Sequence, residues 1–440
     1  MTHRSPPRSS HFSPLLASIA STLLLLAPSM PATASDPEIE ALKDMVRVLQ
    51  QEVATLKTMQ AQAPINAVPV PRAAVGHEAS PSTGSAAPGG GVKFYGALDS
   101  GVEWVSKVGS NHANLTRIPS TTGSVPSRLG VDFEHALRPG LKGIARAEMG
   151  LSLDNGASGQ GGRLFGRQLY VGLDSDYGSV TLGRQYSMLF YSLLNADLLG
   201  PNIYSLGSID AYIPNARFDN SIAWRGKFGD LTLGASYSLG RDTVANTVPA
   251  TGVCAGEEAA SVKCRAWSGI VKYDTARFGV GAGIDQQFGG NGATASFMNG
   301  APALPFSSSS DTDTRLTINA YGHWASLKLG IGGLNRQLKT SAGTVRQQTS
   351  WLQAAYPLTP QFIVDGGLFR VRNDDQERAA QLYVLRGVYS FDQQLAAYLS
   401  LGHIDNSSKA SYGLSAGGFG AAPAAGWGQN GVMAGLRYRF

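Results

Sequence analysis

Charged side chains recur at every second position along several strand-length segments of this 440-residue chain. The alternate positions of the same segments carry Leu, Val, Ile, Phe and Trp, so each predicted strand has one charged face and one apolar face. The charged faces include Arg128, Arg146, Glu148, Arg217, Arg225 and Arg315. Both signs of charge on one face are incompatible with a packed core and predict a water-filled interior. The chemistry of such residues is the attraction of ions and polar solutes.

Residues 188–216 form a long loop whose composition is apolar and aromatic, and its few acids are Asp197 and Asp210. Exposed to solvent, this loop would present an adhesive patch. We therefore expect it to fold into the interior and to place its acids opposite the arginines of the wall. A positive wall facing a negative loop would create a transverse field across a narrow aqueous gap. The alternative is a loop that caps the mouth or contacts a neighbouring subunit.

Catalytic and metal-binding patterns are weak in this sequence. None of the histidines of residues 35–440 lies in a recognisable Ser/His/Asp motif, and we predict neither an enzyme nor a cofactor nor a metal site. The two cysteines, Cys254 and Cys264, lie in one polar stretch and are expected to form a disulfide in an oxidising compartment. Metal binding by this pair is the weaker alternative, because no histidine lies nearby.

The last ten residues indicate which elements position these side chains. Residues 431–440 alternate between an apolar set that ends in Tyr438 and Phe440 and a set of small or cationic residues. Further strand-length segments follow one another from Val92 onward, separated in turn by short turns and by eight long polar loops, near 106–123, 154–163, 188–216, 241–263, 290–312, 338–346, 373–378 and 406–430. The sequence therefore predicts an all-β fold, a sixteen-stranded antiparallel transmembrane β-barrel with the third long loop folded inward.

Three regions precede this barrel, which we assign to residues 92–440. A basic and then apolar start with a small-residue cleavage site predicts a signal peptide over 1–34, with an uncleaved anchor helix as the alternative. Residues 35–63 carry a seven-residue apolar repeat and predict a short periplasmic coiled-coil helix, and the alternative is an amphipathic helix that lies on a neighbour. Residues 64–91 are rich in Pro, Ala, Ser and Gly and predict a linker.

The mean hydropathy and the net charge further limit the class of protein to which this chain can belong. The mean hydropathy is −0.08, as expected when only every second residue of a strand faces lipid. The net charge of +5 is mild for this length and argues against a nucleic-acid partner.

Several motifs resemble the trimeric general-diffusion porins of Gram-negative bacteria, especially the β-proteobacterial type. They are VKFYGALDSGV at 92–102, SRLGV at 127–131, RQLYVGL at 167–173, YGSVTLGRQY at 177–186 and the terminal YRF at 438–440. The resemblance covers about residues 92–440. It implies a homotrimer in the cell outer membrane, a passive channel for ions and small hydrophilic solutes, and an arginine ladder of Arg128, Arg167 and Arg217 with Glu148 beside it.

The resemblance also implies partners. They are outer-membrane lipid and lipopolysaccharide, and the barrel-assembly machinery, which would be engaged through the strand that ends in Phe440. Strand parity points Arg184 outward, where we expect it to join adjacent subunits of a trimer. The helix of residues 36–63 is similar to the extension of sucrose-type porins. Alternative functions are therefore a sugar-selective porin, or a barrel anchor that binds peptidoglycan through this helix.

Overall fold

The structure, a computed structural model, describes residues 90–243, 252–256, 263–296 and 304–440. They belong to one compact unit, Arg72–Phe440. The predicted signal peptide and coiled-coil helix, and the linker up to residue 89, lie outside the described residues.

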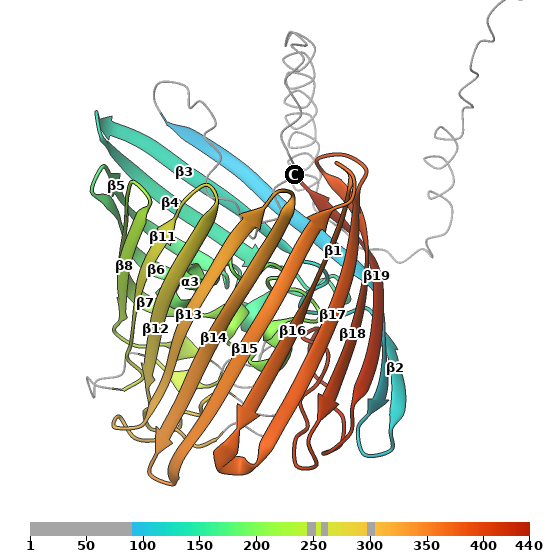
Figure 1. Cartoon of the computed structure of the whole chain (residues 1–440). Coiled ribbons are helices and arrows are strands. Elements are labelled where there is room, and N and C mark those ends of the chain that lie inside the picture. The colour runs from blue at the N-terminus through green and yellow to red at the C-terminus, as the bar shows by residue number, and fades with distance from the viewer. Residues whose placement is uncertain (1–89, 244–251, 257–262, 297–303) are drawn as a thin grey trace, which may run out of the picture. The chain divides into compact units, whose positions relative to one another are not determined.

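Long antiparallel strands make up most of this unit (Figure 1). The strands are β1 (Gly91–Val108), β2 (Ala113–Arg117), β3 (Arg128–Arg138), β4 (Leu141–Gly150), β5 (Gln168–Ser175), β6 (Gly178–Tyr186), β7 (Arg217–Phe228), β8 (Leu231–Ser238), β9 (Asp242–Thr243), β10 (Cys254–Ala255), β11 (Ala266–Asp274), β12 (Phe278–Phe288), β13 (Thr312–Trp324), β14 (Leu327–Thr340), β15 (Gly343–Pro357), β16 (Phe362–Asn373), β17 (Arg378–Ser390), β18 (Leu395–Asn406) and β19 (Gln429–Arg439). Short helices lie between them: α2 (Gly159–Gly162), α3 (Met188–Leu193), α4 (Leu206–Ile209), η1 (Ile213–Asn215) and η2 (Asp374–Gln376).

The main sheet closes on itself. It has seventeen strands in the described part of the chain, and without the short β2, which pairs only with β1, sixteen strands remain in the ring. The first strand closes it, because β1 pairs with β3 at Phe94↔Val131 and with β19 at Val102↔Ala434. Each neighbouring pair is antiparallel, so every backbone N–H and C=O within the ring has a partner strand. This confirms the predicted sixteen-stranded barrel.

The two faces of the barrel wall differ as the alternation predicted. The outer face exposes large apolar side chains, and aromatic residues gather near the rim of short turns, among them Trp324, Tyr356, Phe391, Tyr438 and Phe440. Such a band with aromatic borders is typical of a strand surface in lipid. Among the described residues no helix is long and apolar enough to cross a membrane.

Two of the predicted long loops are tight connections. Only Ser341 and Ala342 separate β14 from β15, whereas we had expected a loop over 338–346. The single turn of η2 joins β16 to β17, where we had expected a loop over 373–378. The polar residues that suggested loops, such as Lys339 and Arg346, belong instead to strands that extend beyond the apolar band. The side chains become polar there because the strand passes from lipid into water, and not because the strand ends.

A β-bulge in β7 overturns one assignment from strand parity. The register shifts between the Gly183↔Ser221 and Gln185↔Phe218 pairs, and Asn220 has a positive φ of 47°. An inserted residue reverses the faces of the residues on one side of it. Strand parity alone would place Phe218 on the lipid face with Ile222, but the bulge turns it inward and it is fully buried within the chain.

Candidate functional site

The third long loop, residues 187–216 (hereafter L3), lies inside the barrel. Its helix α3 packs against β11, β12 and β13, and nearly all of its side chains are buried. The backbone N–H of Met188 donates to Ser268 Oγ at 2.8 Å, and Lys272 Nζ donates to the carbonyl oxygen of Leu194 at 3.0 Å. Both partners come from β11. In Figure 1 α3 is visible through the wall, between the strands and within the ring.

The middle of L3 is attached to the next part of the wall and to the loop before β3. Gln353 of β15 donates to Asp197 Oδ1 at 2.8 Å and accepts from the N–H of Leu199 at 2.8 Å. The N–H of Ile203 donates to the carbonyl oxygen of Gly123 at 2.8 Å. A Cβ at Gly330 of β14 would lie 2.2 Å from the carbonyl oxygen of Ala196. The backbone of L3 therefore runs directly along the inner wall.

A buried charge network fixes the end of L3 to β13 and β14. Asp210 accepts from Arg315 Nε at 2.8 Å and lies 3.6 Å from Arg336 Nη1. Asp313 accepts from the same two arginines, at 3.1 Å from Arg315 and 2.8 Å from Arg336. All four side chains are at most 1% exposed, and the two cations balance the two anions. We call this set the Asp210 latch.

Tyr212 extends the contact between L3 and the wall. Its ring lies under the Arg315 guanidinium at 4.4 Å, and its hydroxyl donates to Asp285 Oδ2 at 2.9 Å. Burial raises the pKa of the Tyr212 hydroxyl well above its ordinary value, so this group remains a hydrogen-bond donor.

The arginines assigned to the ladder lie together on the opposite side of the interior, around Glu148. Arg167 Nε donates to Glu148 Oε1 at 2.7 Å, and Arg128 Nε lies 3.7 Å from Oε2. Arg217 stacks on the ring of Tyr186 at 4.2 Å and donates to its hydroxyl, which also accepts from Arg167 at 2.7 Å. Arg167 and Arg217 are almost fully buried. Arg128 and Arg167 thus share one carboxylate, and Arg217 joins them through the Tyr186 hydroxyl.

The lumen side chains that keep access to solvent at the depth of L3 are a different set. Arg146 pairs with Asp132 through two hydrogen bonds of 2.6 and 2.9 Å, and the two side chains are 28% and 26% exposed. Arg225 is exposed and lies 3.9 Å above the ring of Tyr191, which belongs to α3. Within the described residues no carboxylate lies within ion-pair distance of Arg225. The accessible charge beside L3 is therefore basic.

We had expected the acids of L3 to face the accessible wall arginines across an aqueous gap. They do not. Asp197 and Asp210 are buried and bound to β13, β14 and β15. The sequence shows that both belong to L3, but it cannot show that a loop of this length would run along the wall and use its acids as attachments.

The other predicted site residues have partners within the chain. Arg184 donates to Asp219 and, at 2.7 Å, to the carbonyl oxygen of Gly166. Its place at a subunit interface stays a prediction. Cys254 and Cys264 are joined in a disulfide that packs with Phe306 and Leu338. In the part of the chain that the structure describes, no group of three or more His, Cys, Asp or Glu residues is arranged to hold a metal ion.

Several residues of the site were not assigned from the sequence, among them Arg336, Asp313, Tyr186 and Lys272. Arg336 and Asp313 share the inward parity of their strands, so this signal was available for them. Tyr186 has the outward parity of Leu182, and it is buried because the chain turns inward at the start of L3.

Comparison with known proteins agrees with this architecture. The family model of the Gram-negative porins matches residues 73–409. The chain belongs to the Gram-negative porin family. This places it in the cell outer membrane and favours a channel over an enzyme.

Individual relatives match over shorter stretches. An outer-membrane porin protein of Bordetella pertussis is 27% identical over 165 residues, which are 34% of this chain and 42% of the relative. The major outer membrane protein P.IB of Neisseria meningitidis is 32% identical over 100 residues, which are 22% of this chain and 29% of the relative. The chain thus matches less than half the length of these curated relatives.

Solved structures share the fold over the whole barrel. The anion-selective porin from Comamonas acidovorans has a TM-score of 0.66 and 21% identity, over 80% of this chain and 100% of that one. The trimer form of OmpT from Vibrio cholerae has a TM-score of 0.57 and 16% identity, over the same shares of the two chains.

Proposed function

We propose that this porin is a water-filled channel that lets ions and small hydrophilic solutes diffuse passively across the outer membrane, with a preference for anions. The observation that carries the preference is the pairing of charges around L3. The acids of L3 are bound to wall residues, whereas Arg225 lies beside L3 with no carboxylate partner in the described residues. An ion that passes L3 therefore meets an uncompensated positive charge.

Three observations support an open channel in a trimer. Arg146 and Arg225 keep access to solvent at the depth of L3. The Comamonas acidovorans neighbour is by its title anion-selective, and the OmpT neighbour is a trimer. We include outer-membrane lipid, lipopolysaccharide and the barrel-assembly machinery among the partners. Attachment to peptidoglycan through residues 36–63 stays a prediction.

A sugar-selective channel has less support. Such a channel would present a file of accessible aromatic side chains along its constriction, and the aromatic residues of L3 that could form one are Phe190, Tyr191 and Tyr204. Phe190 and Tyr204 are buried in the contact between L3 and the wall, and Tyr191 is only partly buried. One accessible ring beside Arg225 does not form a file.

The test is the zero-current potential of the purified trimer in a planar bilayer under a salt gradient. The wild type should give the sign of an anion-preferring channel. One unit charge acts on an ion at ~4 Å with about 1 kcal/mol in water, which corresponds to a factor of about five in occupancy. Arg225→Gln should lower the anion-to-cation permeability ratio by up to this factor, and Arg225→Glu should lower it further.

Exchange of an exposed lysine in the rim of short turns, Lys142→Gln, is the matched control, because it removes one charge away from L3. A permeability ratio that stays the same in both Arg225 variants would contradict the proposed preference. A correctly folded trimer without conductance would contradict the channel itself.

A further inference from the structure

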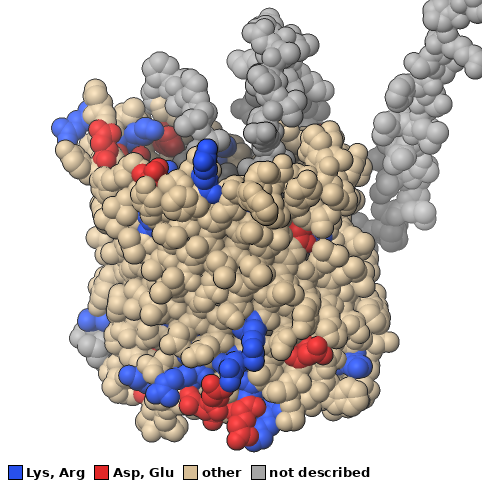
Figure 2. Space-filling view, viewed as in Figure 1, with Lys and Arg blue, Asp and Glu red and all other residues tan. Residues whose placement is uncertain are grey.

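Two of the long loops contact each other at the same rim of the barrel. The first, residues 239–265, joins β8 to β11 and carries Cys254 and Cys264, and we call it the disulfide loop. The second, residues 289–311, joins β12 to β13. Figure 2 shows charged side chains gathered at the rim of the long loops, next to a broad band of uncharged side chains. The described parts of both loops therefore lie beyond the wall that faces lipid.

The backbones of the two loops lie directly on each other. The N–H of Val253 donates to the carbonyl oxygen of Thr294 at 2.9 Å, and the N–H of Thr294 donates to the carbonyl oxygen of Val253 at 3.0 Å. Gly252 has a positive φ of 88°, and a Cβ there would lie 2.6 Å from the Thr294 oxygen and 2.8 Å from the Ser296 nitrogen. Any other residue would therefore push residues 294–296 away.

The disulfide holds this contact in place. The N–H of Cys264 donates to the carbonyl oxygen of Gly289 at 3.0 Å, so this cysteine is fixed next to the end of β12. Cys254, beside the contact with Thr294, is bonded to it although the two cysteines are 10 positions apart in the chain. A cross-link that closes a loop limits the positions that its ends can take. Without the bond, residues 252–255 would be held by noncovalent contacts alone.

Ser296 connects this contact to the Asp210 latch. Its hydroxyl oxygen accepts from Arg315 Nη2 at 2.9 Å and from Arg336 Nη2 at 3.0 Å, and its carbonyl oxygen accepts from Arg336 Nη2 at 2.9 Å. Ser296 is buried with them, and a buried guanidinium is stable only when its N–H groups have acceptors. Ser296 therefore holds both cations of the latch without adding a charge to it.

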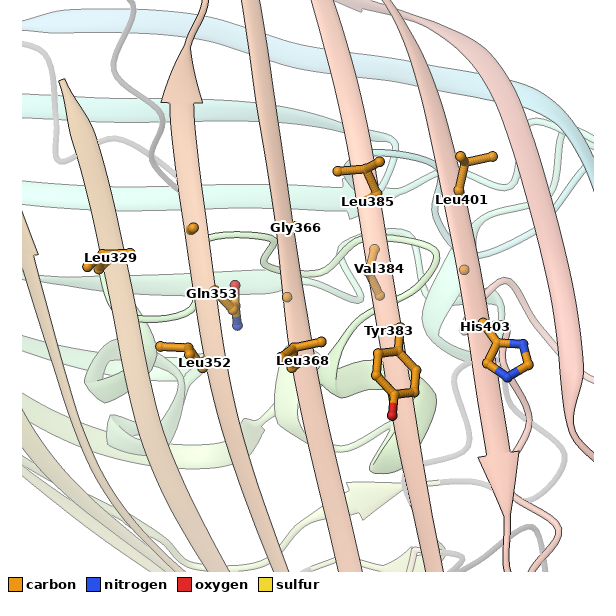
Figure 3. Close-up of a pocket in the computed structure, with 13 residues that line it drawn as sticks. Leu329, Leu352, Gln353, Gly366, Leu368, Tyr383, Val384, Leu385, Leu401 and His403 are labelled. Carbon is orange, nitrogen blue, oxygen red and sulfur yellow. The ribbon is translucent and has the colours of Figure 1, made fainter.

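The middle of L3 is held by other parts of the chain. Gln353 of β15, which is labelled in Figure 3, donates to Asp197 and accepts from the N–H of Leu199. The N–H of Ile203 donates to the carbonyl oxygen of Gly123. These contacts involve neither the disulfide loop nor residues 289–311. The end of L3 can therefore be released while its middle stays attached.

We propose that Ser296 is a positioning residue for L3 and that the disulfide keeps it in position. The disulfide loop is held against Thr294, Thr294 fixes Ser296 two residues further along, and Ser296 orients the arginines that bind Asp210. A covalent bond at the rim of the long loops thus sets how firmly L3 is held inside the lumen. The inference concerns the position of L3, and only its electrical readout rests on the proposed channel.

The test is hydrogen exchange of the full-length trimer in detergent, measured by mass spectrometry. At the end of L3 the N–H of Asp210 donates to the carbonyl oxygen of Leu206 at 2.9 Å, and the N–H of Ile213 donates to that of Asp210 at 3.1 Å. Exchange at such amides reports local opening. Ser296→Ala removes the hydroxyl acceptor of both arginines and should accelerate this exchange by a factor of about ten to a hundred.

Two further variants test the route of the effect. Cys254→Ser/Cys264→Ser should accelerate exchange at the same amides by a smaller factor, because the hydrophobic contacts of the disulfide loop remain. In Asp210→Asn the arginines no longer hold L3, so the additional change Ser296→Ala should add nothing. A role of Ser296 in general stability would instead add to the effect of Asp210→Asn.

Two controls separate this route from a general loosening of the barrel. Ser309→Ala removes an exposed hydroxyl from the same loop as Ser296 and should leave exchange unchanged. The amides of Leu199 and Ile203, in the middle of L3, should exchange at the wild-type rate in every variant.

Wild-type exchange at the end of L3 in Ser296→Ala or in the disulfide variant would overturn the proposal. Equal acceleration in the middle of L3, or an effect of Ser296→Ala that persists beside Asp210→Asn, would overturn it as well. In planar bilayers Ser296→Ala should conduct with excess current noise. A folded trimer without conductance would contradict the proposed channel only, because hydrogen exchange measures the position of L3 without any current.

Discussion

Removal of one charge from the Asp210 latch should release the end of L3. In Asp210→Asn, Arg315 and Arg336 would share Asp313 alone, and a fully buried site that is now neutral would carry a net positive charge. The loss of one partner from a buried ion pair costs about 3–5 kcal/mol. That free energy corresponds to an increase of roughly 150- to 5,000-fold in the population of the detached loop end.

Single-channel recording measures this population directly. A detached end of L3 changes the cross-section of the lumen, so we expect higher mean conductance and excess current noise from Asp210→Asn. The double variant Asp210→Asn/Arg315→Met keeps the Arg336–Asp313 pair and restores neutrality, and should recover most of the wild-type behaviour. Asp176→Asn makes the same chemical change in an exposed short turn and should have no effect.

Wild-type conductance and noise in Asp210→Asn would refute the reasoning. That result would mean that the hydrophobic contacts of L3 with the wall, and not the latch, hold the loop end in place. A double variant that behaves like the single one would refute the charge balance specifically, because both lack Asp210 and only one carries the unpaired cation.

The remaining predictions concern the cluster around Glu148 and the disulfide. Glu148→Gln leaves Arg128 and Arg167 without their shared carboxylate. The zero-current potential should therefore shift in the direction of stronger anion preference, and the unfolding temperature of the trimer should fall. A shift in the direction of cation preference would contradict this prediction. Cys254→Ser/Cys264→Ser opens a loop whose closure is worth about 3 kcal/mol by chain entropy, and should speed trypsin cleavage at Lys263 or Arg265 while conductance persists. Equal cleavage rates in the reduced and oxidised wild type would show that packing on Phe306 and Leu338 holds this loop without the bond.

The barrel was predictable because its signal is local and repeated. A period of two, a terminal aromatic and the alternation of short turns with long loops each limit the fold, and together they predict the number of strands. Strand ends were less predictable. At Lys339 and Arg346 the chain leaves the apolar band while the ladder of hydrogen bonds continues, so composition changes before the secondary structure does.

The faces of individual residues were predictable only where the strand is regular. The bulge at Asn220 buried Phe218, and a bulge leaves no clear mark in one sequence. The inward position of L3 followed from its apolar composition, because a loop rich in Phe, Tyr and Leu needs a surface to cover it. Its path along the wall did not follow, since contacts such as that of Asp197 with Gln353 join residues far apart in the chain.

The sign of the accessible charge depends on this path more than on composition. L3 carries acids and no arginine or lysine, which taken alone suggests a negative loop in the channel. In the folded chain those acids meet Arg315, Arg336 and Gln353 and are removed from water. Burial of charged groups is tolerated only when they are paired or hydrogen-bonded. The wall arginines neutralise Asp210, and Gln353 donates a hydrogen bond to Asp197. Arg225, which lies at the edge of this contact and pairs with an aromatic ring, keeps its charge available to solutes.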